Sequence, residues 1–195
     1  MEPILLASTS PRRQEILRTL NIPFSVFAPD YNEPVVEGIP PSELAELHAI
    51  KKVESVMRIH LQFSAPWILG ADTLICLDDK VFGKPKDRDE AKEMLELFSG
   101  ATHQVITAVC LFDASTKYTS TKTSISTVTF MNLDSEQIDN YLDTGEWQGV
   151  AGGYKIQGLA SCFISKICGS YSGIVGLPIH ELYAILREHG YVFRL

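Results

Sequence analysis

The chain has 195 residues, of which 45% are hydrophobic and 21% charged, the balance of an ordinary soluble globular protein. The formal net charge of −7, from 17 basic and 24 acidic side chains, argues against broad binding to nucleic acid or to a membrane surface, which requires a basic face. We therefore expect no nucleic-acid and no membrane partner. An anionic ligand would have to be held by a few locally placed cations.

The cysteine pattern and the N-terminal residues indicate in which cellular compartment the protein is located. Cys76, Cys110, Cys162 and Cys168 lie in or beside apolar strand patterns and form no C-x-x-C pair. This arrangement predicts reduced core thiols rather than a disulfide framework or a zinc site. No apolar run is long enough to span a bilayer, and the N-terminus has no basic leader region. We expect a cytoplasmic protein.

The N-terminal segment has the pattern of an anion site. Ile4–Ala7 is a predicted strand, Ser8–Ser10 a hydroxyl-rich turn, and Pro11–Leu20 a helix with an apolar stripe. Arg12 and Arg13 occupy the first helical turn, where the positive end of the helix dipole disfavours cations. Free N–H groups at this helix end, together with two arginines, would bind phosphate. The alternative is that the arginines are solvated surface charges.

An acidic loop and a helix follow a second predicted strand, Phe24–Phe27. The loop carries Asp30 and Glu33, oxygen ligands of the kind that suits Mg²⁺ or Mn²⁺, although acidic loops are often only solvated. The helix is predicted from Pro41 to about Met57. Its expected core stripe is Leu47, Ile50, Val53 and Met57. Lys51 falls at the margin of that stripe, where spacing alone favours a surface lysine with its stem on apolar neighbours.

Ile68–Leu77 is a run of small and apolar residues with Asp72 in the middle, and it predicts a buried strand. Burial of an ionised carboxylate is costly unless a donor, a cation or a metal pairs with it. A divalent cation and Lys84 are the nearest candidates. Lys84 comes between this strand and the next helix, where α/β folds often place ligands. A purely structural aspartate that accepts bonds from a loop is the alternative.

The rest of the chain alternates strands and helices, which predicts a mixed α/β fold. The predicted elements are a helix between Asp87 and Gly100, strands at Val105–Phe112 and Tyr118–Met131, a helix capped at Asp134 or Ser135, a glycine-rich loop at Ala151–Gly158, strands at Cys162–Ile167 and Ile174–Leu177, and a helix that begins at Pro178.

A set of short motifs occurs in a fixed order along almost the whole chain: Ala7–Arg13, Gly70–Thr73, Gly83–Pro85, Ser99–Gly100, Thr102–His103, Thr107–Val109, Gly145–Trp147, Tyr154–Gly158 and Gly169–Pro178. Each is weak alone, but the ordered set closely resembles the Maf family of nucleoside triphosphate pyrophosphatases. The Ser-Pro-Arg-Arg opening, Thr73 and Ile156-Gln157-Gly158 resemble the branch that acts on dTTP and UTP.

The resemblance implies one domain over residues 1–195, with an elongated mixed β-sheet flanked by helices and two lobes around a central cleft, as in Maf and inosine triphosphatase folds. It also implies hydrolysis of a nucleoside triphosphate substrate between the α and β phosphates, a divalent cation (Mg²⁺ or Mn²⁺) and a homodimer. The residues of this chain that match family positions are Asp72 as proton acceptor, Arg12, Thr73 and Gln157 in substrate choice, Ser8, Arg13, Lys51 and Lys84 at the phosphates, and Glu33 with Asp72 at the metal.

Two points stay open. Asp72 is either a base or a metal ligand, because the resemblance fits both roles. The chain also departs from the family pattern at Val150, where a lysine is frequent, and at Gly173, where asparagine or alanine is common. The alternative function is a non-catalytic nucleotide sensor that regulates cell division through a partner. Release of pyrophosphate by the purified protein separates the two.

Overall fold

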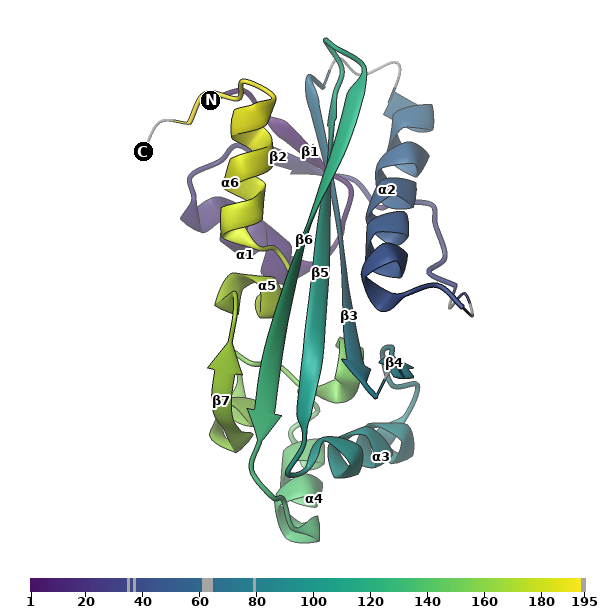
Figure 1. The fold of residues 1–195 in the computed structure, drawn as a ribbon, viewed down its shortest axis with the longest axis vertical. Helices are drawn as coiled ribbons and strands as arrows, with labels where there is room; N and C mark the ends of the chain where they lie inside the picture. The colour runs from purple at the N-terminus through teal and green to yellow at the C-terminus, as the bar shows by residue number, and fades with distance from the viewer. Residues whose placement is uncertain (35, 37, 61–64, 79, 194–195) are drawn as a thin grey trace.

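The computed structural model describes residues 1–34, 36, 38–60, 65–78 and 80–193. A mixed, open sheet of seven strands runs along its length (Figure 1). Six strands follow the order β2 (Phe24–Val26), β1 (Ile4–Leu6), β3 (Trp67–Leu77), β5 (Thr102–Asp113), β6 (Tyr118–Phe130) and β7 (Ile164–Cys168), and β4 (Lys80–Phe82) pairs with β3. The predicted sheet flanked by helices is confirmed, and the long strands β3, β5 and β6 make the molecule elongated.

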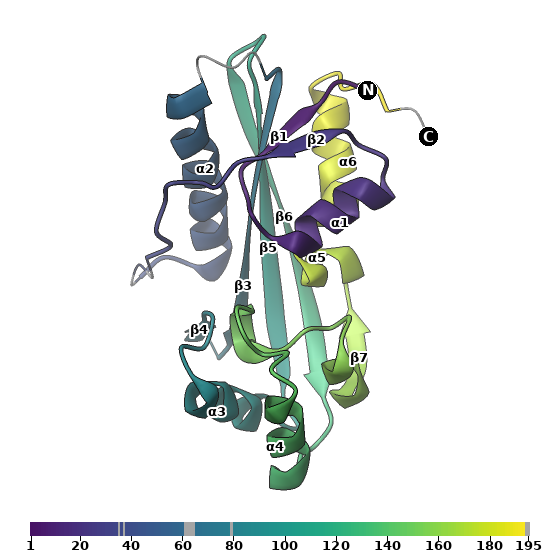
Figure 2. The same cartoon turned by 180° about the vertical axis from the view of Figure 1, so that it is seen from behind.

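Helices cover both faces of the upper half of the sheet (Figures 1 and 2). On one face α1 (Pro11–Thr19) and α6 (Ile179–Glu188) share a core with β1, β3 and β5, and α6 lies against β5 and β6. On the other face lies α2 (Pro41–His60), which contributes Leu44, Ala49 and Val53 to a second core. A Cβ at Gly70 of β3 would lie 2.6 Å from the Ala49 carbonyl oxygen, so only glycine permits this close approach of α2.

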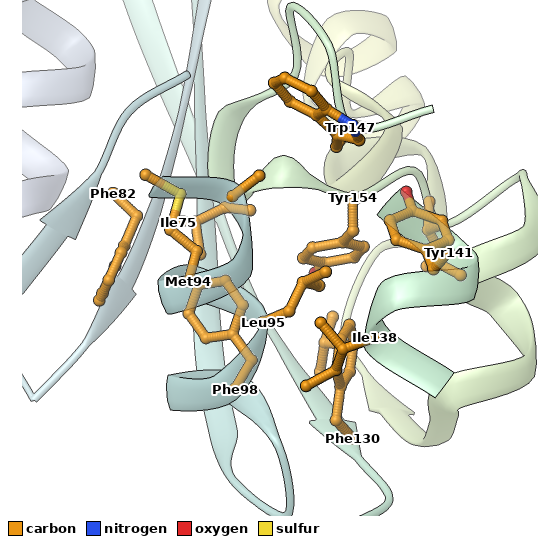
Figure 3. Close-up of a cluster of buried hydrophobic side chains, with 14 of the residues drawn as sticks. Ile75, Phe82, Met94, Leu95, Phe98, Phe130, Ile138, Tyr141, Trp147 and Tyr154 are labelled. Carbon is orange, nitrogen blue, oxygen red and sulfur yellow. The ribbon is translucent and has the colours of Figure 1, made fainter. Parts of the chain in front are cut away.

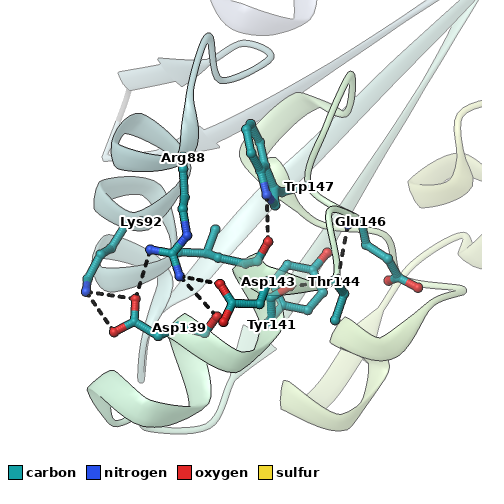
Figure 4. Close-up of polar contacts among 9 residues, drawn as sticks. Arg88, Lys92, Asp139, Tyr141, Asp143, Thr144, Glu146 and Trp147 are labelled. Carbon is teal, nitrogen blue, oxygen red and sulfur yellow. Dashed lines mark hydrogen bonds and ion pairs between the residues drawn. The ribbon is translucent and has the colours of Figure 1, made fainter.

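The lower half has its own core between α3 (Arg88–Phe98) and α4 (Ser135–Asp143), shown in Figure 3. Phe130 and Tyr154 pack edge to face in this core, with ring centroids 4.9 Å apart. Outside it, Arg88 pairs with Asp139 and Asp143 and so joins the two helices (Figure 4). These exposed pairs contribute little energy, so the apolar core holds this half together.

The two halves meet at a gap along one edge of β3. β1 pairs with residues 67–69 of this strand and β4 with residues 75–77. Between them, Gly70–Leu74 has no strand partner on that side within the described ranges, while its other edge pairs continuously with β5. Side chains alternate between the faces of a strand. At such a gap, residues from both faces can therefore reach one site.

The predicted strand at Ile174–Leu177 is wrong. Residues Tyr171–Val175 form the short helix α5, and the Ser170 hydroxyl accepts a hydrogen bond from the Gly173 N–H at 3.0 Å. The apolar run fits either a strand or a buried helix, and the serine cap decides between them. The predicted strand at Cys162–Ile167 begins later, at Ile164, after a 3₁₀ turn at Leu159–Phe163, and the 151–158 loop opens with another at Ala151–Gly153.

The cysteine prediction is correct for Cys76 and Cys110, which are buried, but wrong for Cys162 and Cys168, which are exposed. Cys168 lies on β7, the edge strand of the sheet, whose side chains are largely exposed, and Cys162 lies in the turn before it. Within the described part of the chain, no helix is long and apolar enough to cross a membrane.

The helical phase predicted for α2 is shifted by about one residue. Leu47, Ile50 and Met57 are only partly buried at the edge of the core. The inner face consists of Leu44, Ala45, His48, Ala49, Lys52, Val53 and Val56. Lys52, and not Lys51, therefore points from α2 toward the sheet.

Candidate active site

A cavity of about 280 Å³ lies at the gap in the sheet edge. Its upper wall comes from residues 8–13 after β1, and its floor from Asp72 and Thr73 of β3. Its lower wall comes from Lys84 and from residues 149–151 and 154–157. The cavity thus lies between the two halves of the molecule, in the position of the predicted cleft.

The cavity is cationic although the chain is acidic. The charged residues that line it are Arg12, Arg13, Lys52, Lys84 and Lys155 against Glu33 and Asp72. These five cations and two carboxylates give a formal charge of +3, in a chain whose net charge is −7. Such local charge attracts a polyanion to this place and not to the surface at large.

Asp72 is paired at the floor of the cavity. Its Oδ1 accepts a hydrogen bond from Lys52 Nζ at 2.6 Å, and both side chains are almost fully buried. Lys52 Nζ also lies 2.6 Å from Glu33 Oε1. The expectation that the buried carboxylate has a cationic partner is met by Lys52. Lys84 lines the same cavity, but no ion pair between it and Asp72 is found among the described residues.

Lys51 is not part of the cavity lining. Its Nζ pairs with Glu54, one turn further along α2, at 2.8 Å, and both side chains are more than two-fifths exposed. The sequence position matched the predicted phosphate-side cation, but the phase of the helix turns Lys51 away and places Lys52 at the site.

Glu33 reaches the cavity from a loop that is attached to α2 at two points. Tyr31 Oη lies 2.9 Å from Nδ1 of His48, and Glu33 contacts Lys52, one turn after His48. Burial of the Glu33 carboxylate would raise its pKa, but the charge and hydrogen bond of Lys52, then Lys84 and Arg13, hold that pKa below the usual value. Burial lowers the pKa of His48, which favours the neutral ring, and the charges of Asp72 and Glu33 oppose that shift.

Arg13 is a buried junction between three segments. Its Nε donates to the Gly176 carbonyl oxygen at 2.8 Å, its Nη1 to Ser8 Oγ at 3.0 Å, and its Nη2 to Thr73 Oγ1 at 3.3 Å. The side chain therefore joins the turn after β1, the middle of β3 and the end of α5. Burial lowers the pKa of Arg13, and the charges of Asp72 and Glu33 oppose that shift.

Thr73 belongs to the same network. Its Oγ1 lies 3.0 Å from Oγ1 of the buried Thr107, which is in turn 2.8 Å from the Gly173 carbonyl oxygen. A hydroxyl has one proton. If Thr107 donates to that carbonyl, Thr73 donates to Thr107 and accepts from Arg13. The orientation of Thr73 is thus fixed by its neighbours.

Arg12 and Gln157 line the cavity from opposite walls, and neither side chain has a protein partner in the described ranges. Burial lowers the pKa of Arg12. Gln157 belongs to a loop held from below. Glu146 accepts a hydrogen bond from the Leu159 N–H at 2.9 Å. Near Glu146, the Trp147 indole donates to the Leu142 carbonyl oxygen at 2.9 Å (Figure 4). Both side chains are available to a ligand.

The carboxylates suit a metal shared with a ligand better than a metal held by protein alone. Among the described residues no group of three or more His, Cys, Asp or Glu side chains could hold an ion. Asp72 Oδ2, however, is buried without a hydrogen-bond partner, and Glu33 faces the same cavity. Mg²⁺ is often bound by one or two carboxylates that leave its other positions to water and phosphate oxygens.

The structure therefore brings together Ser8, Arg12, Arg13, Glu33, Asp72, Thr73, Lys84 and Gln157 of the predicted residues, and leaves out Lys51. Lys52 and Lys155 were missed. Lys52 recurs with Ala45, His48 and Ala49 at helical spacing, but the more hydrophobic Leu47, Ile50 and Met57 favour a different phase of the helix. Lys155 has no signal beyond its place in the glycine-rich loop.

Comparison with known proteins identifies the family to which the chain belongs. The family model described as "Maf-like protein" matches residues 3–189. The dTTP/UTP pyrophosphatases of Desulforamulus reducens and Treponema denticola are 44% and 43% identical, over 97% and 96% of this chain and 98% and 97% of their own lengths. That of Symbiobacterium thermophilum is 41% identical over 98% of this chain and 96% of its own. The resemblance inferred from the motifs is confirmed, and the chain belongs to the family of Maf-like proteins.

Proposed function

We propose that the protein is a nucleoside triphosphate pyrophosphatase that hydrolyses dTTP and UTP to the monophosphate and pyrophosphate. The observation that carries the proposal is the buried Asp72 carboxylate at the floor of a cavity with a formal charge of +3. A triphosphate needs several cations around it, and phosphoryl chemistry depends chiefly on positioning and charge stabilisation. The relatives named dTTP/UTP pyrophosphatase match this chain over nearly its whole length.

Each residue has a role in the proposed reaction. Arg12 and Lys84, for whose side chains no hydrogen bond or ion pair is found in the described ranges, bind the phosphates through charge-assisted hydrogen bonds. Arg13 holds Ser8 and Thr73 in place through hydrogen bonds. Its positive charge also contributes to the attraction of the phosphates to the cavity. Gln157 offers an amide donor and an acceptor to the O4 and N3–H edge of uracil or thymine.

Asp72 acts on the attacking water. Lys52 fixes the carboxylate through Oδ1, which leaves the buried Oδ2 to accept a proton from water. Asp72 and Glu33 would together hold a divalent cation, Mg²⁺ or Mn²⁺, which supplies positive charge to the phosphates when bound. The family resemblance supports a homodimer, and we retain a cytoplasmic location, for which the buried Cys76 and Cys110 are the remaining support.

A nucleotide panel tests the proposal. The purified protein is incubated with dTTP, UTP, CTP, dATP and GTP, with Mg²⁺ or Mn²⁺, and pyrophosphate and monophosphate are measured. We expect dTTP and UTP to be hydrolysed well above the purine nucleotides. Equal rates for all bases would contradict the assigned specificity. Nucleotide binding without pyrophosphate release would favour the alternative of a non-catalytic regulator.

A further inference from the structure

Lys155 is a cation of the cavity for whose ammonium group the described part of the chain offers no hydrogen bond or ion pair. It lines the cavity between Tyr154 and Ile156, and its side chain is half-buried. The two carboxylates of the cavity pair with Lys52, and no ion pair between either of them and Lys155 is found among the described residues.

The backbone around Lys155 is held firmly. Tyr154 and Ile156, on either side, are 3% and 5% exposed. The Tyr154 hydroxyl lies 2.7 Å from Nε2 of the buried His103, and the Lys155 carbonyl oxygen accepts a hydrogen bond from the Gly158 N–H at 3.1 Å. The Cα atom of Lys155 is thus held at a defined place beside the cavity, within one side-chain length of a ligand there.

Lys155 also lies on the same wall as Lys84. The Gly152 N–H donates to the Gly83 carbonyl oxygen at 2.9 Å, which joins the 151–155 loop to the segment that carries Lys84. Val150, on the same wall, is apolar and buried. Lys155 is thus the cation that the 149–157 segment contributes to the cavity, opposite Arg12 on the upper wall.

We propose that Lys155 is a substrate-binding residue that contacts the phosphate chain and, with Lys84, forms the lower half of a cationic clamp. This inference rests on the proposed function, which supplies the polyanion. An ammonium group has three donors and no acceptor, so its ligand must be an acceptor, and an anion is preferred in a cavity whose cations outnumber its carboxylates by five to two. A phosphate chain bound by Lys84, Lys155 and Arg12 would contact both halves of the molecule, because Arg12 belongs to the upper half and the two lysines to the lower half.

Titration calorimetry with inorganic pyrophosphate, in buffer without divalent metal, tests the proposal directly. Lys155→Met, Lys155→Arg and the control Lys86→Met are compared with the wild type. Lys86 is exposed, lies near Lys84 and does not line the cavity. We expect about tenfold weaker binding for Lys155→Met, equivalent to one lost charge-assisted contact. We expect Lys155→Arg and Lys86→Met to stay near the wild type, and thermal melts to confirm that every variant is folded.

Steady-state kinetics give a second readout. Lys155→Met should raise KM for UTP by about tenfold. The preference for UTP over CTP should stay unchanged, because the base is read elsewhere. Pyrophosphate binding by Lys155→Met equal to that of Lys86→Met would overturn the proposal, as would a wild type that does not bind pyrophosphate. These outcomes are distinct from a failure of the proposed function, which would appear as a wild type that releases no pyrophosphate from UTP.

Discussion

Lys52 and Asp72 form a buried ion pair, with Nζ and Oδ1 2.6 Å apart and side chains only 5% and 4% exposed. Removing two charges from water is costly, and the attraction within the pair offsets that cost only while both partners are present. The pair lies on the floor of the cationic cavity, so the same contact stabilises the fold and holds the proposed catalytic carboxylate in one orientation.

Lys52→Met should therefore damage both stability and activity. It leaves Asp72 buried without a cation, a change that typically costs about 3–5 kcal/mol of unfolding free energy. Lys51→Met is the matched control. Its ion pair with Glu54 is largely exposed, so its loss should cost less than about 1 kcal/mol. Urea unfolding and pyrophosphate release measure the two effects, and equal behaviour of the two variants would contradict the assignment of Lys52.

Asp72→Asn should reduce turnover by roughly 10²–10⁴, the usual contribution of a positioned acid or base. An isolated buried carboxylate would be expected to stabilise the apo protein when it is neutralised. Because Lys52 is its partner, we expect instead a loss of roughly 1–3 kcal/mol as a charged hydrogen bond becomes a weaker one. Rate and denaturation are measured on the same preparation. A destabilised variant with full activity per folded molecule would make Asp72 purely structural.

The central strand and its carboxylate were predictable from sequence because the signal is local. An apolar run with one acidic residue requires a partner wherever it is buried. The partner, Lys52, was not predictable in the same way, because its place depends on which face of α2 packs on the sheet. Leu47, Ile50 and Met57 lie at the edge of the α2 core and are only partly buried, whereas the inner face carries Ala49, which packs on Gly70, and the polar His48 and Lys52. Hydrophobicity alone therefore favours the wrong phase.

The gap at Gly70–Leu74 was also beyond the sequence, because it depends on where β1 and β4 end against β3. Long-range pairing of this kind has no local signature. The helix α5 is an intermediate case. Its apolar residues fit a strand, and the cap at Ser170 was the local evidence that favoured a helix.

Arg13→Lys should lower stability even though it keeps the positive charge. A lysine cannot reproduce the planar fork that contacts Ser8, Thr73 and Gly176 together. We expect a loss of about 2–3 kcal/mol together with a higher KM. Arg12→Lys is the control, since Arg12 has no protein partner in the described part of the chain, and it should change KM without changing the melting temperature. If both variants melt like the wild type, Arg13 does not join the three segments.

Gln157→Ala should reduce selectivity more than it reduces the maximal rate. The side chain is exposed to the cavity, and its backbone is held independently through Glu146 and Leu159, so truncation should leave the fold intact. Loss of one base-reading contact corresponds to about a tenfold drop in the ratio of kcat/KM for UTP to that for CTP. A collapse in rate with unchanged selectivity would instead assign Gln157 to catalysis.

The Glu33 carboxylate should make stability depend on pH in the acid range. Burial would raise the pKa of Glu33, but the charge and hydrogen bond of Lys52 lower it below its ordinary value in the folded protein. A lowered pKa stabilises the fold above the unfolded value and loses that contribution as pH falls through the folded value. The difference in unfolding free energy between wild type and Glu33→Gln should therefore be constant from about pH 7 to 5 and shrink below about pH 4.5. Because the side chain is 40% exposed, salt should weaken the effect. A difference that does not change with pH would mean that Glu33 is not paired with Lys52 in solution.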